Sequence, residues 1–281
     1  MGIFARIKDF IERFGEPDLS YAIDDGEDSF PPPLVPQGFV RLNTAFGSFE
    51  AEDAPSSGGL VIDPYGAVDA LDEGLLMRFN PLDLVPSDDV KAAGDMAYRI
   101  AECVIPKQET SFITEGLGHD RVMLAALIQW MAMTWGKDEG FRNLSDLGRI
   151  VRHQSLVDSL VTGGPLPPPR GKDGDSLIDD LKDRDTNWHA GKWTDEPTWV
   201  SQATDLLADA GARTLAYARL ATALDFLKDR SAGDVMADTD VDIDAVRNSD
   251  VFIYMPREVE REDERYRLAR FWLALVGMIR D

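Results

Sequence analysis

The sequence predicts an α+β protein that is mostly helical, in which a large helical insertion interrupts a small parallel sheet. Two short apolar runs, residues 60–64 (Leu-Val-Ile-Asp-Pro) and 251–256 (Val-Phe-Ile-Tyr-Met-Pro), each end in proline. Such runs of β-branched and aromatic residues, closed by a loop signal, are typical of buried parallel strands. The stretch between them is almost wholly helical in its periodicity, so we expect the two strands to be neighbours in one sheet.

The segment before the first strand divides into two parts. Residues 3–14 place apolar side chains at helical spacing with charged residues between them, which predicts an amphipathic helix. This helix either docks on the protein's own core or is presented to a partner or a membrane surface. Residues 15–57 are acidic and contain a run of three prolines, which predicts an extended or loosely packed tether with some strand around 39–42.

The region after the first strand follows helical patterns. Residues 75–79 are a second extended candidate, and Ser87 is the expected N-cap of the helix that begins near Val90. Glycines and prolines at 163–169 break the helical pattern, and Gly211 can divide the last long helix of the insertion. We expect further helices near 119–136, 143–162, 176–183 and 197–229, and a final amphipathic helix over 268–279.

The formal charge of −22 is the strongest signal in the composition. A chain this acidic repels phosphate groups at long range, and it has no segregated basic patch, so we expect no direct binding to nucleic acid. The hydrophobic fraction of 44% is that of a globular protein. A basic protein is the partner that such a surface favours.

The cysteine content and the hydropathy of the chain indicate its cellular compartment. Cys103 is the single cysteine, which excludes an internal disulfide, and the lack of a signal peptide fits a reducing cytoplasm. The longest apolar run, 122–135, is too short to span a bilayer and predicts a core helix instead. We therefore expect a cytoplasmic protein without a transmembrane segment.

The sequence contains no phosphate-binding loop. Such a loop needs glycines at fixed offsets followed by lysine and a hydroxyl residue. Gly-Lys pairs occur at 136–137, 171–172 and 191–192, but serine or threonine never follows them and the earlier glycine is absent each time. No nucleotide cofactor is therefore predicted for the isolated chain.

Few residues qualify as catalytic or ligand-binding candidates. Asp63 ends the first strand, so by local pattern it is a weak candidate for holding a nucleotide-bound magnesium ion, although a turn-organising role is the favoured interpretation. His119, His153 and His189 have no zinc-binding spacing. We predict no metal site and no catalytic residue.

The order of these landmarks resembles the TraG/TraD-like type IV coupling proteins, the motor ATPases of conjugation and type IV secretion. Residues 63–67 (Asp-Pro-Tyr-Gly-Ala) keep the aspartate, proline and glycine of the family's strand-ending turn and lose its lysine and glutamate. Residues 80–83 (Asn-Pro-Leu-Asp) match a family segment outright, and 142–147 (Arg-Asn-Leu-Ser-Asp-Leu) resemble a phrase of its all-α domain. The residues that match the family motifs are Asp63, Pro64, Gly66, Asn80, Pro81, Leu82 and Asp83.

The resemblance covers roughly residues 58–280 and implies part of a RecA-like parallel sheet with an inserted all-α domain. It divides the chain into residues 1–57 (helix and tether), 58–86 with 240–281 (partial RecA-like α/β domain) and 87–239 (all-α insertion). Both Walker motifs and the family's transmembrane hairpin are missing. A sheet that lacks strands leaves an edge or an apolar face, so we expect either a partner or a local rearrangement to cover it.

Three functions remain open at this stage. The first is a coupling-protein-like component of a conjugative or type IV secretion system that recruits cargo or machine subunits through its helical region and does not hydrolyse ATP alone. The second is one piece of a split DNA-translocating ATPase whose phosphate loop comes from another chain. The third is an acidic adaptor or decoy for basic proteins.

Overall fold

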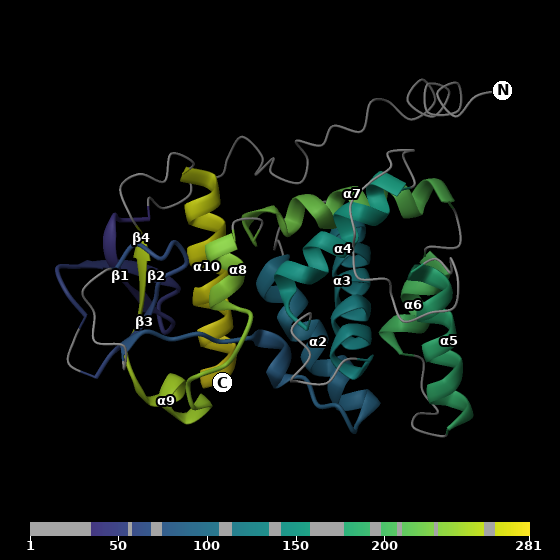
Figure 1. The fold of residues 1–281 in the computed structure, drawn as a ribbon, viewed down its shortest axis with the longest axis horizontal. Helices are drawn as coiled ribbons and strands as arrows, with labels where there is room; N and C mark the ends of the chain where they lie inside the picture. Colours follow the sequence, from purple (N-terminus) through teal and green to yellow (C-terminus); the bar gives the residue numbers. More distant parts are fainter. Residues whose placement is uncertain are drawn as a thin grey trace. The chain divides into compact units, whose positions relative to one another are not determined.

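Four strands form one mixed sheet with the order β2-β1-β4-β3 (Figure 1). Strands β3 (Leu60–Ile62) and β4 (Val251–Met255) lie side by side in parallel, with Leu60 opposite Val251 and Ile62 opposite Ile253. The predicted pairing of the two distant apolar runs is thus confirmed. The computed structural model describes residues 35–55, 58–68, 75–106, 114–134, 142–157, 177–191, 198–206, 210–227, 230–255 and 262–281.

A β-hairpin occupies the other side of β4. Strand β1 (Gly38–Asn43) pairs antiparallel with β4, and β2 (Ser48–Glu52) pairs antiparallel with β1. The sheet is therefore mixed, whereas the sequence predicted a parallel one. Val40 and Leu42 are buried, while Phe39, Arg41 and Asn43 are less buried, which is the alternation of a half-buried strand. The second part of the expected tether thus belongs to the sheet and covers the edge of β4.

The outer edge of β3 is covered over a short length. Val61 forms an isolated parallel bridge with Leu76, and the Met77 N–H donates to the Val61 carbonyl over 2.8 Å. The extended candidate at 75–79 is confirmed to this extent. The predicted helix at 3–14, the prolines at 31–33 and the break at 163–169 lie outside the described residues.

Between β3 and β4 the described chain is helical. The 3₁₀ helix η3 (Pro81–Leu84) comes first, and a second one, η4 (Asp225–Leu227), lies between α7 and α8. Among the described residues, the stretch predicted at 197–229 contains two α-helices, α6 and α7, and the 3₁₀ helix η4. The α-helices are α2 (Val90–Val104), α3 (Thr114–Thr134), α4 (Leu144–Val157), α5 (Leu177–Ala190), α6 (Trp199–Leu206), α7 (Ala210–Ala223), α8 (Arg230–Val235) and α9 (Ile243–Asn248), followed after β4 by α10 (Glu262–Arg280).

Side chains stabilise the start of α2 and the end of α10. Asp89, and not the predicted Ser87, is the N-cap of α2, because its carboxylate accepts the Ala92 N–H. At the other end of the chain, Arg99 donates to the carbonyl of Met278 and Arg247 to that of Ile279. Cationic side chains at these last carbonyls complement the negative end of the α10 dipole.

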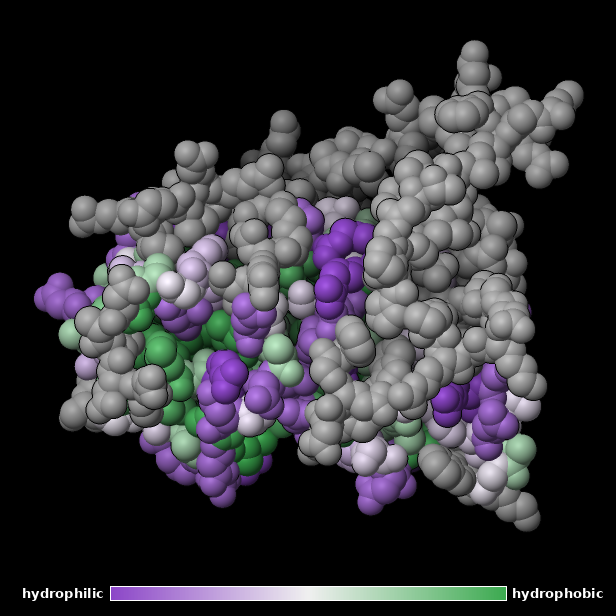
Figure 2. Space-filling view, viewed as in Figure 1, coloured by the Kyte–Doolittle hydropathy of each residue, from purple (hydrophilic) through white to green (hydrophobic). Residues whose placement is uncertain are grey.

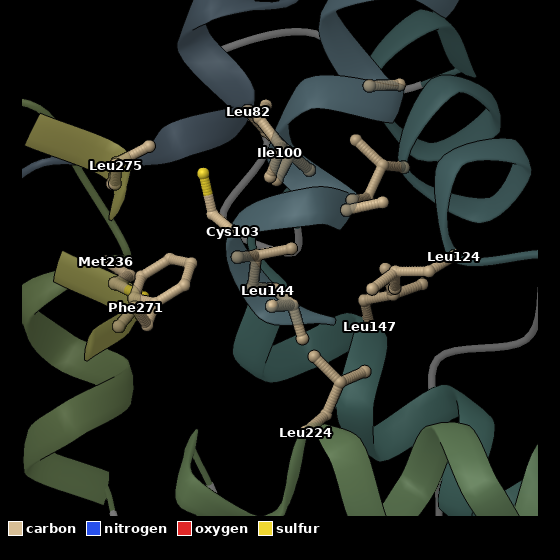
Figure 3. Close-up of a cluster of buried hydrophobic side chains, with 14 of the residues drawn as sticks. Leu82, Ile100, Cys103, Leu124, Leu144, Leu147, Leu224, Met236, Phe271 and Leu275 are labelled. Carbon is tan, nitrogen blue, oxygen red and sulfur yellow. The ribbon is translucent and has the colours of Figure 1, made fainter. Parts of the chain in front are cut away.

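One hydrophobic core joins the sheet to the helices. It includes Val40 and Ile253 from the sheet, Leu275 from α10 and Leu124 from α3, all of them buried. Figure 3 shows side chains of this core reaching from α10 across α2 to α4. Residues Leu34–Asp281 accordingly form one compact unit. No helix among the described residues has the length and hydropathy needed to cross a membrane.

Close packing explains two residues inside this core. Gly94 on α2 faces Trp199 on α6, and a Cβ added there would lie 3.2 Å from the indole ring. The absence of a side chain lets the indole N–H donate to the Gly94 carbonyl over 3.0 Å. Cys103 packs on the same helix, and burial raises the pKa of its thiol to about 12, so the thiol is unreactive near neutral pH.

Candidate functional site

The connections that enter and leave the helical insertion run beside each other. The Phe79 N–H donates to the Val235 carbonyl over 2.9 Å, and the Asp240 N–H donates to the Arg78 carbonyl over 3.2 Å. The Arg78 guanidinium also pairs with the Asp240 carboxylate at 2.9 Å. Two chain segments that are about 160 residues apart in the sequence therefore lie side by side where the β3–β4 unit meets the helices, and we call them the stem.

The Asn-Pro-Leu-Asp motif forms η3 at the top of this stem. Asn80 is 4% exposed, and its side-chain oxygen caps η3 by accepting the Leu82 N–H over 3.1 Å. Its backbone N–H donates to Thr239 Oγ1, which in turn donates to Asp83 Oδ2 over 2.7 Å. Pro81 follows the cap because proline suits the first helical position.

Arg142, just before α4, joins the motif to the helical region. Its Nη1 donates to Asp83 Oδ1 over 2.7 Å, and its Nη2 donates to the Leu82 carbonyl over 2.7 Å. The Asn80 amide returns a bond to the Arg142 carbonyl at 2.6 Å. The structure thus brings together the two phrases, 80–83 and 142–147, that carry the resemblance. We call Asn80, Asp83, Arg142 and Thr239 the polar junction.

Burial controls the electrostatics of the polar junction. The side chain of Arg142 is 1% exposed and that of Asp83 is 20% exposed. Burial lowers the pKa of the Arg142 guanidinium, and the neighbouring Asp83 carboxylate opposes this by raising it. The ordinary pKa of arginine lies far above neutral pH, so the group stays charged and needs the carboxylate as its partner.

The residues after Arg142 begin α4 with a reciprocal cap. Asn143 Oδ1 accepts the Asp146 N–H over 2.8 Å, and Asn143 Nδ2 donates to Asp146 Oδ2 over 2.7 Å. This arrangement satisfies donors at the helix start that would otherwise be buried without partners. Ser145 donates to the Leu227 carbonyl, and Gly233 of α8 packs directly against it. The phrase 142–147 thus positions α4 against two other elements.

The first matching motif, residues 63–66, forms a turn of its own after β3. The two oxygens of the Asp63 carboxylate accept the N–H groups of Tyr65 and Val68, over 3.3 and 2.8 Å. Pro64 is buried, and Gly66 has a φ of +61°, which glycine adopts without strain. This is the geometry of an aspartate that organises a turn.

The described residues do not fit a bound magnesium nucleotide. Asp63 already serves two backbone donors, and no group of metal-binding side chains occurs among the described residues. Of the three Gly-Lys pairs only Gly191 is described, at the end of α5, and its lysine is not. We therefore derive no chemical step through ATP.

A cluster around His189 resembles a hydrolase triad in composition but not in order. Thr198 donates to Asp185 over 2.6 Å, and His189 Nε2 lies 3.5 Å from the same carboxylate oxygen. A triad needs the imidazole between hydroxyl and carboxylate, whereas here the carboxylate lies between the other two. Thr198 and Ser201 exchange bonds as a cap of α6. His119 is exposed on α3, and the His153 side chain lies outside the described residues.

Sequence reasoning found only part of the polar junction. Asn80 and Asp83 were identified from their motif and Arg142 from the phrase 142–147, but Thr239 was missed, as were Arg78 and Asp240 of the adjoining stem. No local signal marks these three, because their partners lie more than 150 residues away. The chain matches no protein-family model, no curated protein and no solved structure. Functional inference therefore depends on the strand pairing and the polar junction.

Proposed function

We propose that this protein is a coupling-protein-like component of a conjugative DNA-transfer or type IV secretion system. In this role its helical region recruits protein cargo or machine subunits, and the chain does not hydrolyse ATP by itself. The observation that carries the proposal is the parallel pairing of β3 with β4 around a long helical excursion. This is the order of elements that the resemblance implies for a partial RecA-like unit.

The polar junction supports the same proposal. The two phrases that resemble the family lie 59 residues apart in the sequence, and they bind each other through the buried Arg142–Asp83 pair. In this chain the contact gives both phrases one structural role, which is the attachment of α4 to η3. The junction fixes the helical insertion on the sheet unit, so a partner bound to the helices is held at a defined position.

The charge of the chain indicates the kind of cargo. A net charge of −22 favours a basic protein partner through electrostatic attraction, and it disfavours direct contact with the transferred DNA. In this role the protein acts in the cytoplasm and reaches the inner membrane only through its partners. The complex with cargo is expected to weaken as salt is raised.

Co-purification with relaxosome and secretion proteins tests the proposal, together with calorimetric titration of Mg-ATP into the pure chain. We expect a salt-sensitive complex and no heat of ATP binding. Charge reversal at two exposed positions of α5 and α6, Asp183→Lys and Asp205→Lys, should weaken the complex. The matched change Asp53→Lys, outside the helices, should not.

Four outcomes would overturn the proposal or parts of it. Turnover of ATP by the pure chain would exclude the non-hydrolysing role, and ATP binding only after addition of a second chain would favour a split motor. Failure to bind any relaxosome or secretion component would remove the coupling role altogether. Binding of unrelated basic proteins with equal affinity would instead indicate an acidic adaptor.

A further inference from the structure

Strand β2 is the outer strand of the described sheet on the hairpin side. Its inner edge pairs with β1 from Ser48 to Glu52, and no described strand pairs with its outer edge. An edge strand presents backbone N–H and C=O groups that can accept a further strand. Ala51 and Glu52, near its end, are exposed.

Side-chain contacts hold this hairpin in place. Arg280, at the end of α10, donates to Thr44 Oγ1 in the turn over 3.0 Å. Arg41 on β1 pairs with Asp250 at 2.8 Å and lies 3.8 Å from Glu50 on β2. Because the hairpin is tied to α10 and to the start of β4, a strand added to its edge meets an ordered surface.

The turn carries an exposed aromatic side chain. Phe46 is 82% exposed, which is unusual for a large apolar side chain among the described residues. Its neighbour Gly47 has a φ of +61°, which closes the turn without strain. On the sheet side of the molecule, hydrophobic residues are visible at the surface next to hydrophilic ones (Figure 2). An aromatic residue is a typical anchor at protein interfaces.

The charges on β2 indicate what the edge accepts. Glu50 and Glu52 are two residues apart, so they lie on the same face of the strand. A second copy of the chain would place like charges opposite each other, which is unfavourable in cross-strand pairs. Glu50 already accepts a bond from Asn43 and lies near Arg41. Lysine or arginine on an incoming strand would therefore lie opposite the exposed Glu52.

We propose that the outer edge of β2 binds an extended basic segment of a partner protein as a fifth strand, with Phe46 as its apolar anchor. Main-chain hydrogen bonds supply the pairing, and alternate basic side chains supply the selectivity. This inference uses the sheet edge and not the helical region. It therefore holds or fails independently of the proposed role in secretion.

Titration of the full chain with synthetic peptides tests the inference. One peptide alternates lysine with valine, a second replaces lysine with glutamate, and a third keeps every lysine but has proline at its centre. The first should bind and shift the backbone NMR signals of Phe49 and Ala51. The glutamate peptide should not bind, and proline should weaken binding about tenfold, because it removes a strand hydrogen bond.

Variants of the chain separate the edge from bulk charge. Glu52→Lys and Phe46→Ser should each weaken the binding of the lysine peptide by roughly five- to tenfold. Asp205→Lys on α6 changes the net charge as much as Glu52→Lys does, and it should alter affinity by less than about twofold. Phe46 is 82% exposed, so its variant should fold even if the change at Glu52 disturbs the hairpin.

The results that contradict the inference are equally specific. Equal binding of the lysine and proline peptides, or equal effects of Glu52→Lys and Asp205→Lys, would mean that bulk charge alone drives binding. Concentration-dependent dimers that disappear in the Phe46→Ser variant would assign the edge to a second copy. Loss of secretion partners in Asp205→Lys with retained peptide binding would leave this inference intact.

Discussion

At the scale of single residues, Arg142 contributes more to the stability of the fold than its position in the sequence suggests. It is one of the largest side chains that the structure buries fully, and it bonds to Asp83 and the Leu82 carbonyl. A buried charge is costly unless it is paired, so the pair is needed to keep η3 and α4 together. Its role is that of a positioning residue.

Arg142→Met should lower the free energy of unfolding by roughly 3–5 kcal/mol, because it leaves the Asp83 carboxylate without its guanidinium partner. Arg142→Lys should lose less stability than Arg142→Met, because lysine restores the positive charge. It should still be less stable than the wild type, because lysine has no planar group that can reach two acceptors. Urea unfolding followed by circular dichroism measures both.

Arg78→Met provides the matched control in the same stem. The Arg78–Asp240 pair is half exposed, with side-chain exposures of 52% and 36%, and such pairs contribute about 0–1 kcal/mol. If the two arginine variants lost equal stability, burial would not be what makes Arg142 important.

At the scale of secondary-structure elements, an ion pair between the buried Asp120 and the partly exposed Arg219 joins α3 to α7. Arg219 donates to Asp120 Oδ1 through Nε and Nη2, over 3.1 and 2.8 Å. Burial raises the pKa of the Asp120 carboxyl, and the Arg219 bond opposes this without cancelling it. The folded state therefore holds the Asp120 proton to a higher pH than the unfolded state does.

The sign of the resulting pH dependence follows from linkage. Between the ordinary aspartate value of about 3.9 and the raised folded value, the folded state binds more protons, so stability contributed by Asp120 falls as pH rises. Asp120→Asn removes this loss. Compared with the wild type, the Asp120→Asn variant should therefore have a more favourable free energy of unfolding at about pH 7 than at about pH 4.

Urea unfolding of both proteins across this pH range provides the measurement. Arg219→Met serves as a companion variant: it removes the cation that lowers the pKa of Asp120, so the fall in stability with rising pH should become larger. A wild type that gained stability over Asp120→Asn as pH rose would show that the ion pair outweighs burial.

The elements differ in how well the sequence predicted them. Strands β3 and β4 were predicted because their apolar runs end at proline, and α10 because its apolar stripe is continuous. The hairpin was missed in large part because its residues follow an acidic, proline-containing segment, and β2 has only one large apolar residue, Phe49. Arg142, Thr239 and Asp240 could not be paired from sequence, since such contacts depend on the tertiary fold.

At the scale of the whole molecule, the helical insertion and the sheet share one core. Helix α10 packs on the sheet strands and also on α2, and Phe271 of α10 contacts Phe226 of η4 with ring centroids 5.5 Å apart. Domains that fold independently have their own cores and boundaries that few contacts cross. The region 87–239 was predicted from the resemblance to be an inserted domain, so its cooperativity with the sheet is the property to measure.

We expect residues 34–281 to unfold in one cooperative step, with the sheet and the insertion losing structure together. Leu124→Ala in α3 and Leu275→Ala in α10 remove fully buried side chains from opposite parts of the shared core, and each should cost about 2–5 kcal/mol. Hydrogen exchange read by mass spectrometry should show that either variant lowers protection in α3 and in β4 alike, because global opening limits exchange in both. The surface change Asp205→Lys is the control that leaves protection unchanged.

If Leu124→Ala lowered protection in α3 and left protection in β4 as it was, the insertion would be a separate folding unit. The polar junction would then be a hinge between two domains instead of a fixed link inside one.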